Sequence, residues 1–250
     1  EFFAFHSLVD PSPSARIQYA QYARNLLMYA MDRAVLGAAP GVPFRHPAFS
    51  TFNRASWWGE GFPLTVDWIY DAVDGSGQRI LTAADRATIR TVFLRWTSEC
   101  LNAATSGNEH PQPVGVVNSP ALLSDPGQLR WGMNNYYQAH ARQVTLMALA
   151  LDAADDPGGT LRGYVANATG AWLYQEYALL EEAPKVIAAY GLPAGTTGLG
   201  IGSGGIPPEG HMYGAAVGHV LESLLALRTA GYDDPALSGP QIELIRSGYW

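Results

Sequence analysis

Trp131-Gly-Met-Asn-Asn-Tyr-Tyr-Gln-Ala-His-Ala-Arg142 is the stretch from which the rest of the chain can be interpreted. It gathers amides, phenols, an imidazole and a guanidinium, and it leads directly into the apolar run Val144–Asp152. Positions four or five apart are neighbours on a helix, so we expect Asn135, Tyr136 and His140 near one face. We interpret this stretch as half of an active site at the mouth of a buried helix.

A second polar segment, Gly205-Ile-Pro-Pro-Glu-Gly-His-Met-Tyr213, also precedes an apolar helical pattern. We expect it to supply the other half of the site. The hypothesis requires the two segments to face each other across a cleft.

Composition narrows the class of protein. The 250 residues are 48% hydrophobic and 15% charged, which is typical of a globular protein with a substantial core. The net charge of −7 and the lack of a Lys/Arg run argue against a nucleic-acid partner. The single Cys100 excludes internal disulfides and a cysteine-based metal site, and no His-x-x-x-His spacing points to zinc. No apolar run approaches the ~18 residues of a membrane span.

Aromatic residues are frequent, with 7 Trp and 13 Tyr. Several stand in polar, Gly-rich surroundings, where a ring can stack on the apolar face of a pyranose. The alternative that Trp simply fills the core stays open. We expect sugar binding by the following residues: Trp57, Trp58, Trp131, Tyr136 and Tyr137.

Helical patterns separated by long loops run through the chain. After an irregular entry over Glu1–Pro13 and a long loop over Ala38–Gly61, no segment alternates as a strand does. The predicted helices cover about 14–36, 63–72, 87–104, from the opening stretch to 155, 161–182 and 210–230, with a short helix reaching Tyr190 and one more starting at Pro240. Ser14 is the expected cap of the first helix, and Thr82 with Asp85 that of the third.

This pattern predicts an all-α fold, in which helical hairpins form an (α/α) toroid with loops at one rim building the site. We expect a single toroid-like domain over residues 1–250. The helices are too few for a full toroid, and the start at Glu1 indicates processing or a fragment of a longer chain.

The order of several sequence blocks resembles that of a known family. Phe62-Pro-Leu-Thr-Val-Asp-Trp-Ile-Tyr-Asp71 and Leu81-Thr-Ala-Ala-Asp-Arg-Ala-Thr-Ile-Arg90 are similar to a passage of heparinase II/III-like and alginate-lyase-like polysaccharide lyases. Asn134-Asn135 is similar to the Asn-Asn-His passage of alginate lyases, although Tyr136 stands in place of the His.

Gly205–Tyr213 is similar to the Pro-Glu-Gly passage of the heparinase-like lyases, with Gly204 in place of an Asp. These blocks cover about residues 60–225. Members of the family have an (α/α) toroid domain, usually followed by β-sandwich domains. The resemblance implies a secreted or periplasmic enzyme, as in bacteria, that acts on an acidic polysaccharide.

The implied reaction is β-elimination at a uronic acid, which requires no metal or other cofactor. A base removes the C5 proton, the bond at C4 breaks, and the neighbouring carboxylate must be neutralised as charge develops. Asn134 or Asn135, helped by Arg142, suits the neutralising role. His140 or His211 is the expected base.

A tyrosine is expected to protonate the leaving oxygen. Tyr213 is the first choice and Tyr137 the second, and a Tyr held as phenolate is also a possible base. Glu209 is expected to contact the substrate.

Each of these residues also has a structural interpretation. The alternatives are a helix cap for Asn134, a hydrogen-bonded helix residue for His140, an ion pair for Arg142, a favourable helix-dipole position for Glu209 and a core position for Tyr213. His219 lies further along an apolar helix and is interpreted as structural.

Two other functions stay open. A glycoside hydrolase on the same scaffold needs two carboxylates across the cleft, and the available acids are Glu60, Asp67, Asp71 and Glu209. A non-catalytic glycan-binding domain would keep the cleft without the chemistry.

Overall fold

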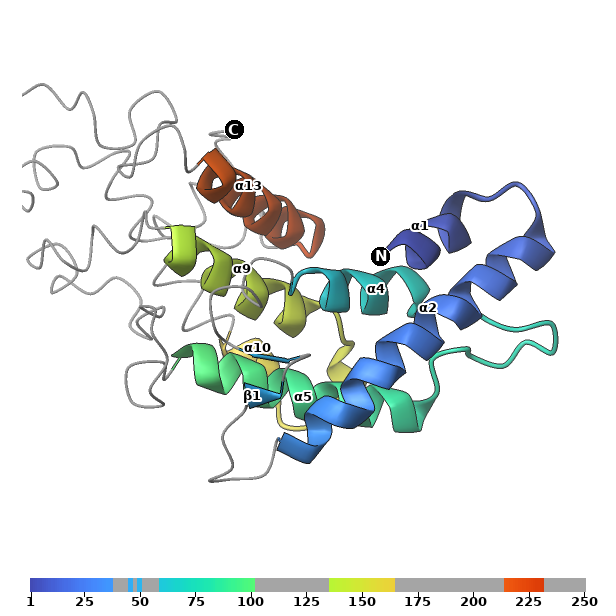
Figure 1. The fold of residues 1–250 in the computed structure, drawn as a ribbon, viewed down its shortest axis with the longest axis horizontal. Coiled ribbons are helices and arrows are strands. Elements are labelled where there is room, and N and C mark those ends of the chain that lie inside the picture. Colours follow the sequence, from blue (N-terminus) through green and yellow to red (C-terminus); the bar gives the residue numbers. More distant parts are fainter. Residues whose placement is uncertain (38–44, 47–48, 51–58, 102–134, 165–213, 232–250) are drawn as a thin grey trace, which may run out of the picture. The chain divides into compact units, whose positions relative to one another are not determined.

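A computed structural model describes the protein over residues 1–37, 45–46, 49–50, 59–101, 135–164 and 214–231. Most of these residues are helical, which confirms the all-α fold class (Figure 1). The chain divides into two compact units, one of residues 1–99 with 146–162 and the other of 100–145 with 163–250.

Helix α1 (Phe2–Val9) corrects the irregular entry predicted for Glu1–Pro13. It has no side-chain cap and depends instead on packing against neighbouring helices of the first unit (Figure 1). Ala4 is fully buried, and the Phe5 ring meets Trp68 edge to face with 6.0 Å between the ring centroids. Tertiary packing therefore stabilises a helix that local sequence signals do not indicate.

Helix α2 (Pro13–Ala34) is capped two residues earlier than the predicted Ser14. The cap is Ser12, whose hydroxyl accepts a hydrogen bond from the Ala15 amide at 3.4 Å. Pro13 occupies the first helical position, where its missing amide proton has no cost. The buried face of α2 consists of small and flexible side chains: Ala20, Ala23, Leu27, Met28, Met31 and Ala34.

The end of α2 leads into a single 3₁₀ turn, η1 (Val35–Gly37). Beyond it, β1 (Arg45–His46) pairs antiparallel with β2 (Phe49–Ser50), and His46 lies opposite Phe49. The prediction of loop throughout this region was wrong at these positions. Two-residue strands are too short to show the alternation by which a strand is recognised in sequence.

Helix α4 (Gly61–Ile69) begins two residues before the predicted start and ends before the predicted Ala72. A tight turn follows, because the Asp74 carboxylate accepts hydrogen bonds from the amides of Ser76 at 2.8 Å and Gln78 at 3.0 Å. Gly77 adopts a φ of +81°, a conformation that glycine reaches without strain. The predicted break after α4 is thus confirmed.

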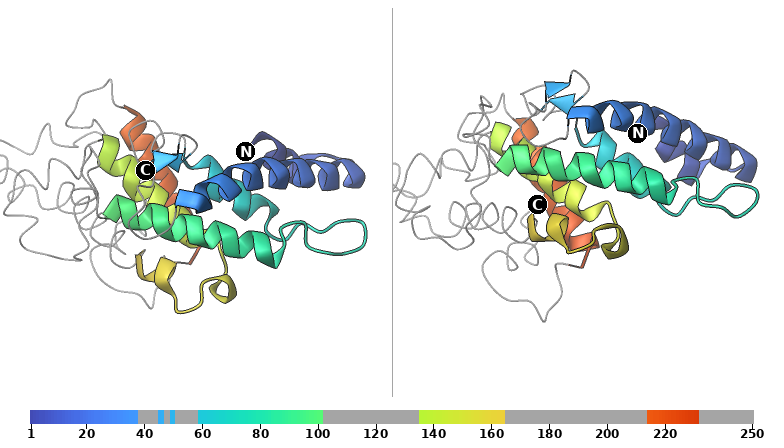
Figure 2. Two further views of the ribbon diagram at one scale, coloured as in Figure 1. Left: turned by 60° about the horizontal axis from the view of Figure 1, so that its bottom comes forward. Right: turned by 90° about the horizontal axis from the view of Figure 1, so that it is seen from below.

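Helix α5 (Ala83–Leu101) starts at the predicted capping box. The Thr82 amide donates to the Asp85 carboxylate at 2.9 Å, and the Asp85 amide donates to the Thr82 hydroxyl at 3.2 Å. Arg24 of α2 binds the same carboxylate through two nitrogens, at 2.8 and 3.0 Å, so that α2 and α5 lie side by side (Figure 2). The predicted apolar face is fully buried: Ile89, Val92, Phe93 and Trp96.

The Asp85 carboxyl shows how these contacts act together. Burial raises its pKa, but hydrogen bonds from Arg24 and Thr82 outweigh burial and hold the pKa below the ordinary value. The carboxylate is therefore ionised over the physiological range, where it serves both the helix cap and the ion pair.

A turn near residue 155 is held to α4 and α5 by two carboxylates of the first unit. Asp155 accepts hydrogen bonds from the Tyr70 hydroxyl and from Arg86, the latter at 2.7 Å. Asp156 pairs with Arg90 at 3.0 Å and also accepts from the Leu161 amide at 2.9 Å.

That turn contains η2 (Ala153–Asp155) and leads into α10 (Thr160–Tyr164). Helix α10 starts where the long helix 161–182 was predicted, and the rest of that prediction lies outside the described residues.

The second unit contains α13 (Gly214–Thr229) and residues 135–145 of α9 (Asn135–Leu149). The opening stretch of the sequence therefore begins a helix, as predicted, although that helix ends before the predicted Asp155. Figure 1 shows α13 alongside α9. An ion pair between Arg142 and Glu222 links them.

Candidate functional site

The predicted site residues divide into three groups. Seven lie outside the described part of the chain: Trp57, Trp58, Trp131, Asn134, Glu209, His211 and Tyr213. Four lie on α9 with only their backbone described: Asn135, Tyr136, Tyr137 and His140. Arg142 alone has a described side chain, so the geometry of the site is known from α9 and from what contacts it.

The register of α9 revises the expected grouping of its polar residues. Tyr136 and His140 are four residues apart and share a face, as predicted. Asn135 and His140 are five apart, which places them about 140° apart around the helix. Asn135 instead shares a face with Arg142, seven residues later.

Helix α9 is buried on all sides from Gln138 onward within the second unit. The side chains at every position from Gln138 to Thr145 with a described side chain are buried, on all faces of the helix. Three polar residues among them, Gln138, Arg142 and Thr145, follow one another at helical spacing and form a polar row on one face. Buried polar groups must be hydrogen-bonded to be tolerated, and the Thr145 hydroxyl donates to the Ala141 carbonyl at 2.8 Å.

Arg142 is the charged member of this row, and only 2% of its side chain is exposed. Its Nη1 donates to the Glu222 carboxylate of α13 at 2.7 Å, a charge-assisted hydrogen bond. Glu222 is half exposed, so water still reaches one partner of the pair. The contact links α9 to α13.

Sequence reasoning did not identify Glu222. It anticipated an acidic partner for Arg142 as the structural alternative, and the described contact is of that kind. The partner lies 80 residues further along the chain. No local spacing signal marks such a pair, because it depends on how two distant helices pack.

His219, one turn before Glu222 on α13, completes the described cluster. Its side chain is buried, with 6% exposed. Burial and, secondarily, the positive charge of Arg142 lower the pKa of His219 to about 4. The imidazole is consequently neutral at physiological pH, and the structural interpretation of His219 is consistent with this placement.

The cluster of Arg142, Glu222 and His219 has a clear chemical character. It combines one buried cation, one half-exposed anion and one buried imidazole. The Arg142 guanidinium binds Glu222 and has little access to solvent, so it links α9 to α13 rather than facing water.

Several polar residues in and near the Phe62–Asp71 and Leu81–Arg90 passages make ion pairs and hydrogen bonds within the first unit. Asp71 pairs with Arg79 at 2.9 Å. Burial and the hydrogen bond to Asp155 raise the pKa of Tyr70, whose hydroxyl remains protonated. Arg86 and Arg90 likewise bind Asp155 and Asp156. These contacts stabilise the first unit.

Neither metal ligation nor membrane insertion is indicated by the described residues. Within these ranges no three His, Cys, Asp or Glu side chains gather as metal ligands would. None of the helices in the same ranges combines the length and apolar character that a membrane crossing requires.

Comparisons of the chain with protein-family models, with curated proteins and with solved structures found no match.

Proposed function

We propose that the protein is a polysaccharide lyase that cleaves a uronic-acid-containing polysaccharide by β-elimination, on a scaffold that forms part of an (α/α) toroid. A base takes the C5 proton, the C4–C5 double bond forms, and the C4–oxygen bond breaks. The leaving oxygen receives a proton. Atoms balance without water or an external electron acceptor.

The observation that carries the proposal is the start of helix α9 at Asn135, directly after Asn134. The amides at a helix N-terminus and its dipole favour negative charge. Negative charge develops on the substrate carboxylate as C5 loses its proton. Asn134 and Asn135 are therefore the groups proposed to neutralise that carboxylate.

The proposed base is His140 or His211, and the proposed acid is Tyr213, with Tyr137 as the alternative. His140 lies on the same α9 face as Tyr136, which supports a shared role for these two residues toward the sugar. Trp57, Trp58, Trp131 and Glu209 remain the proposed contacts to neighbouring sugar units.

Arg142 receives a different role from the one expected. Its burial and its ion pair with Glu222 support a positioning function, in which the pair holds α9 so that its first turn faces the substrate. A small displacement of a catalytic group can cost a large factor in rate, so this positioning matters to the proposed reaction.

The hydrolase alternative is less well supported. It needs two carboxylates across a cleft, and Asp71 is bound to Arg79. Lyase products absorb near the ultraviolet edge because of their new double bond, whereas hydrolase products do not. A glycan-binding domain would bind the polymer without releasing any product.

The test is an ultraviolet absorbance assay on alginate, hyaluronan, heparan-type and pectin-like chains. We expect one of them to yield an increasing signal. His140→Gln or His211→Gln should lower kcat by roughly 100-fold or more, because general base catalysis contributes about that factor. His6→Gln, on α1, is the control and should leave kcat unchanged. Absence of signal on every polymer, with binding retained, would overturn the proposal.

A further inference from the structure

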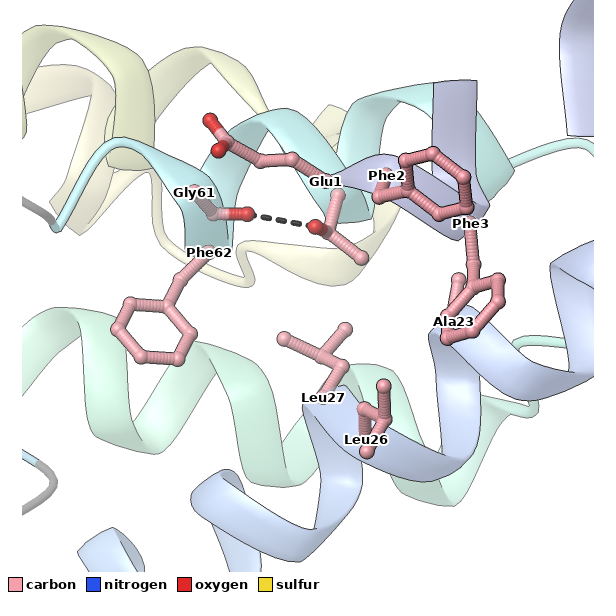
Figure 3. A pocket seen from close by; sticks show the side chains of 9 residues that line it. Glu1, Phe2, Phe3, Ala23, Leu26, Leu27, Gly61 and Phe62 are labelled. Atoms are coloured by element: carbon pink, nitrogen blue, oxygen red, sulfur yellow. Dashed lines mark hydrogen bonds between the residues drawn. The ribbon is translucent and has the colours of Figure 1, made fainter. Parts of the chain in front are cut away.

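An apolar pocket lies in the first unit between α1, α2 and α4. Its volume is about 310 Å³. Figure 3 shows the rings of Phe2 and Phe3 on one side of the space and Phe62 on the other, with Leu26 and Leu27 between them. Nothing in the proposed lyase chemistry uses this pocket.

The aromatic walls are held in place by rings outside the pocket. Phe3 packs against Tyr22 with 5.5 Å between the centroids, and Phe62 packs against Trp96 at 6.0 Å. Each of these two wall rings thus has an aromatic neighbour against which it packs.

The lining offers little to a polar ligand. The Thr65 hydroxyl already donates to the Gly61 carbonyl at 2.6 Å, a bond drawn in Figure 3. Glu1 is the one ionisable side chain among the lining residues. Gly61 and Ala23 add small, uncharged surface to the lining, and a Cβ at Gly61 would lie 3.3 Å from the Glu1 side chain.

The mouth of the pocket is itself apolar. The Phe2 residue is 67% exposed and Leu26 is 62% exposed, and both line the pocket. Removing apolar surface from water is favourable. A ligand in the pocket that also covers these two side chains therefore gains from the burial of its own surface and of theirs.

We propose that this pocket binds a small, uncharged, flat aromatic molecule of about the size of two fused rings. An apolar cavity of roughly 150 Å³ is enough to hold benzene. The larger volume here matches a bicyclic ring, and aromatic walls favour offset or edge-to-face contacts with it. Most of the driving force is burial of apolar surface, so we expect millimolar affinity for a fragment of this size.

The experiment uses indole as the probe and saturation-transfer NMR with titration as the measurement. Leu26→Glu places a charge at the mouth at an exposed position and should weaken indole binding by roughly tenfold or more. Leu36→Glu is the matched control. It carries the same change in the 3₁₀ turn after α2, where Leu36 is 78% exposed and does not line the pocket.

A second variant tests whether weaker binding comes from the added charge alone. Leu26→Trp adds bulk that takes up part of the space without adding charge, and it should also weaken indole binding. Thermal unfolding of all variants checks that each is folded.

Equal indole binding by the parent protein and both Leu26 variants would overturn the proposal, as would no binding by the folded parent protein. Sedimentation supplies a further contrary outcome. If Leu26→Glu dissociates an oligomer and indole does not bind, the pocket is covered by a second copy of the chain.

Discussion

At the scale of single residues, Arg142 is the most informative feature of the described structure. A guanidinium with 2% of its side chain exposed must regain in the fold the interactions it loses with water. The 2.7 Å contact with Glu222 supplies part of that compensation. The half-exposed carboxylate reduces the cost further, because only one charge of the pair is fully removed from solvent.

A double-mutant cycle measures this coupling. Glu222→Gln should lower the free energy of unfolding by about 1–2 kcal/mol, since it removes a charge-assisted bond from a buried cation but leaves a polar group in place. In an Arg142→Met background the same change should cost less than about 0.5 kcal/mol. Urea unfolding of the four proteins provides the values, and strictly additive costs would contradict the pairing.

His219 predicts a pH dependence of stability. The folded-state pKa is about 4, below the value of 6.5 expected in the unfolded chain. As pH falls below 6.5 the unfolded state gains a proton that the folded state does not accept, so stability decreases on acidification. The groups described around this imidazole are Arg142, whose charge reinforces the effect, and Glu222 on the same helix.

Between pH 7 and pH 5 this single group should cost about 2 kcal/mol. The measurement is urea unfolding at both pH values for the parent protein and for His219→Gln, which cannot titrate. We expect a smaller pH effect in the variant. Identical pH dependence in the two proteins would show that His219 does not carry this effect.

Residue types could be predicted better than residue partners. A structural role for His219 was predicted from its place in an apolar helical pattern, and the side chain is buried. The pairing of Arg142 with Glu222 was not predicted, because it depends on the contact of two helices far apart in sequence. The side chains of the other proposed site residues lie outside the described part of the chain, so their roles remain proposals.

At the scale of elements, local signals identified some helix ends and missed others. The predicted Thr82–Asp85 capping box is present with both of its reciprocal hydrogen bonds, because a cap depends only on residues three apart. Helix α1 was missed. It has no side-chain cap, and its stability comes from contact with α2 and α4.

The turn at Asp156 provides a test at this scale. Its carboxylate is 2% exposed, pairs with Arg90 and accepts from the Leu161 amide. Asp156→Asn should lower the free energy of unfolding by about 2–3 kcal/mol, because it removes a buried ion pair and weakens the start of α10.

Asp152→Asn, at an exposed position of the same segment, is the control for that substitution. It should change stability by less than about 0.5 kcal/mol. Chemical denaturation measures both variants. Similar costs at the two positions would contradict the role assigned to Asp156.

At the scale of the whole molecule, hydrophobic periodicity was sufficient to predict an all-α protein, since each helix carries its own 3.6-residue pattern. How the helices are arranged depends on contacts between distant segments, which periodicity does not encode. The toroid therefore remains part of the proposal. So does the cleft between the Asn134-Asn135 segment and the Glu209–Tyr213 segment, because both include residues outside the described ranges.

The mass of the oligosaccharides released from a uronate polymer tests the central claim most directly. Elimination adds no water, so we predict that each new non-reducing end is an unsaturated uronate, lighter by one water than the hydrolysis product. Fragments with the full mass of hydrolysis would contradict the account and favour a glycoside hydrolase. Release of no fragment from any of the four polymers by the folded protein would contradict an enzymatic role altogether.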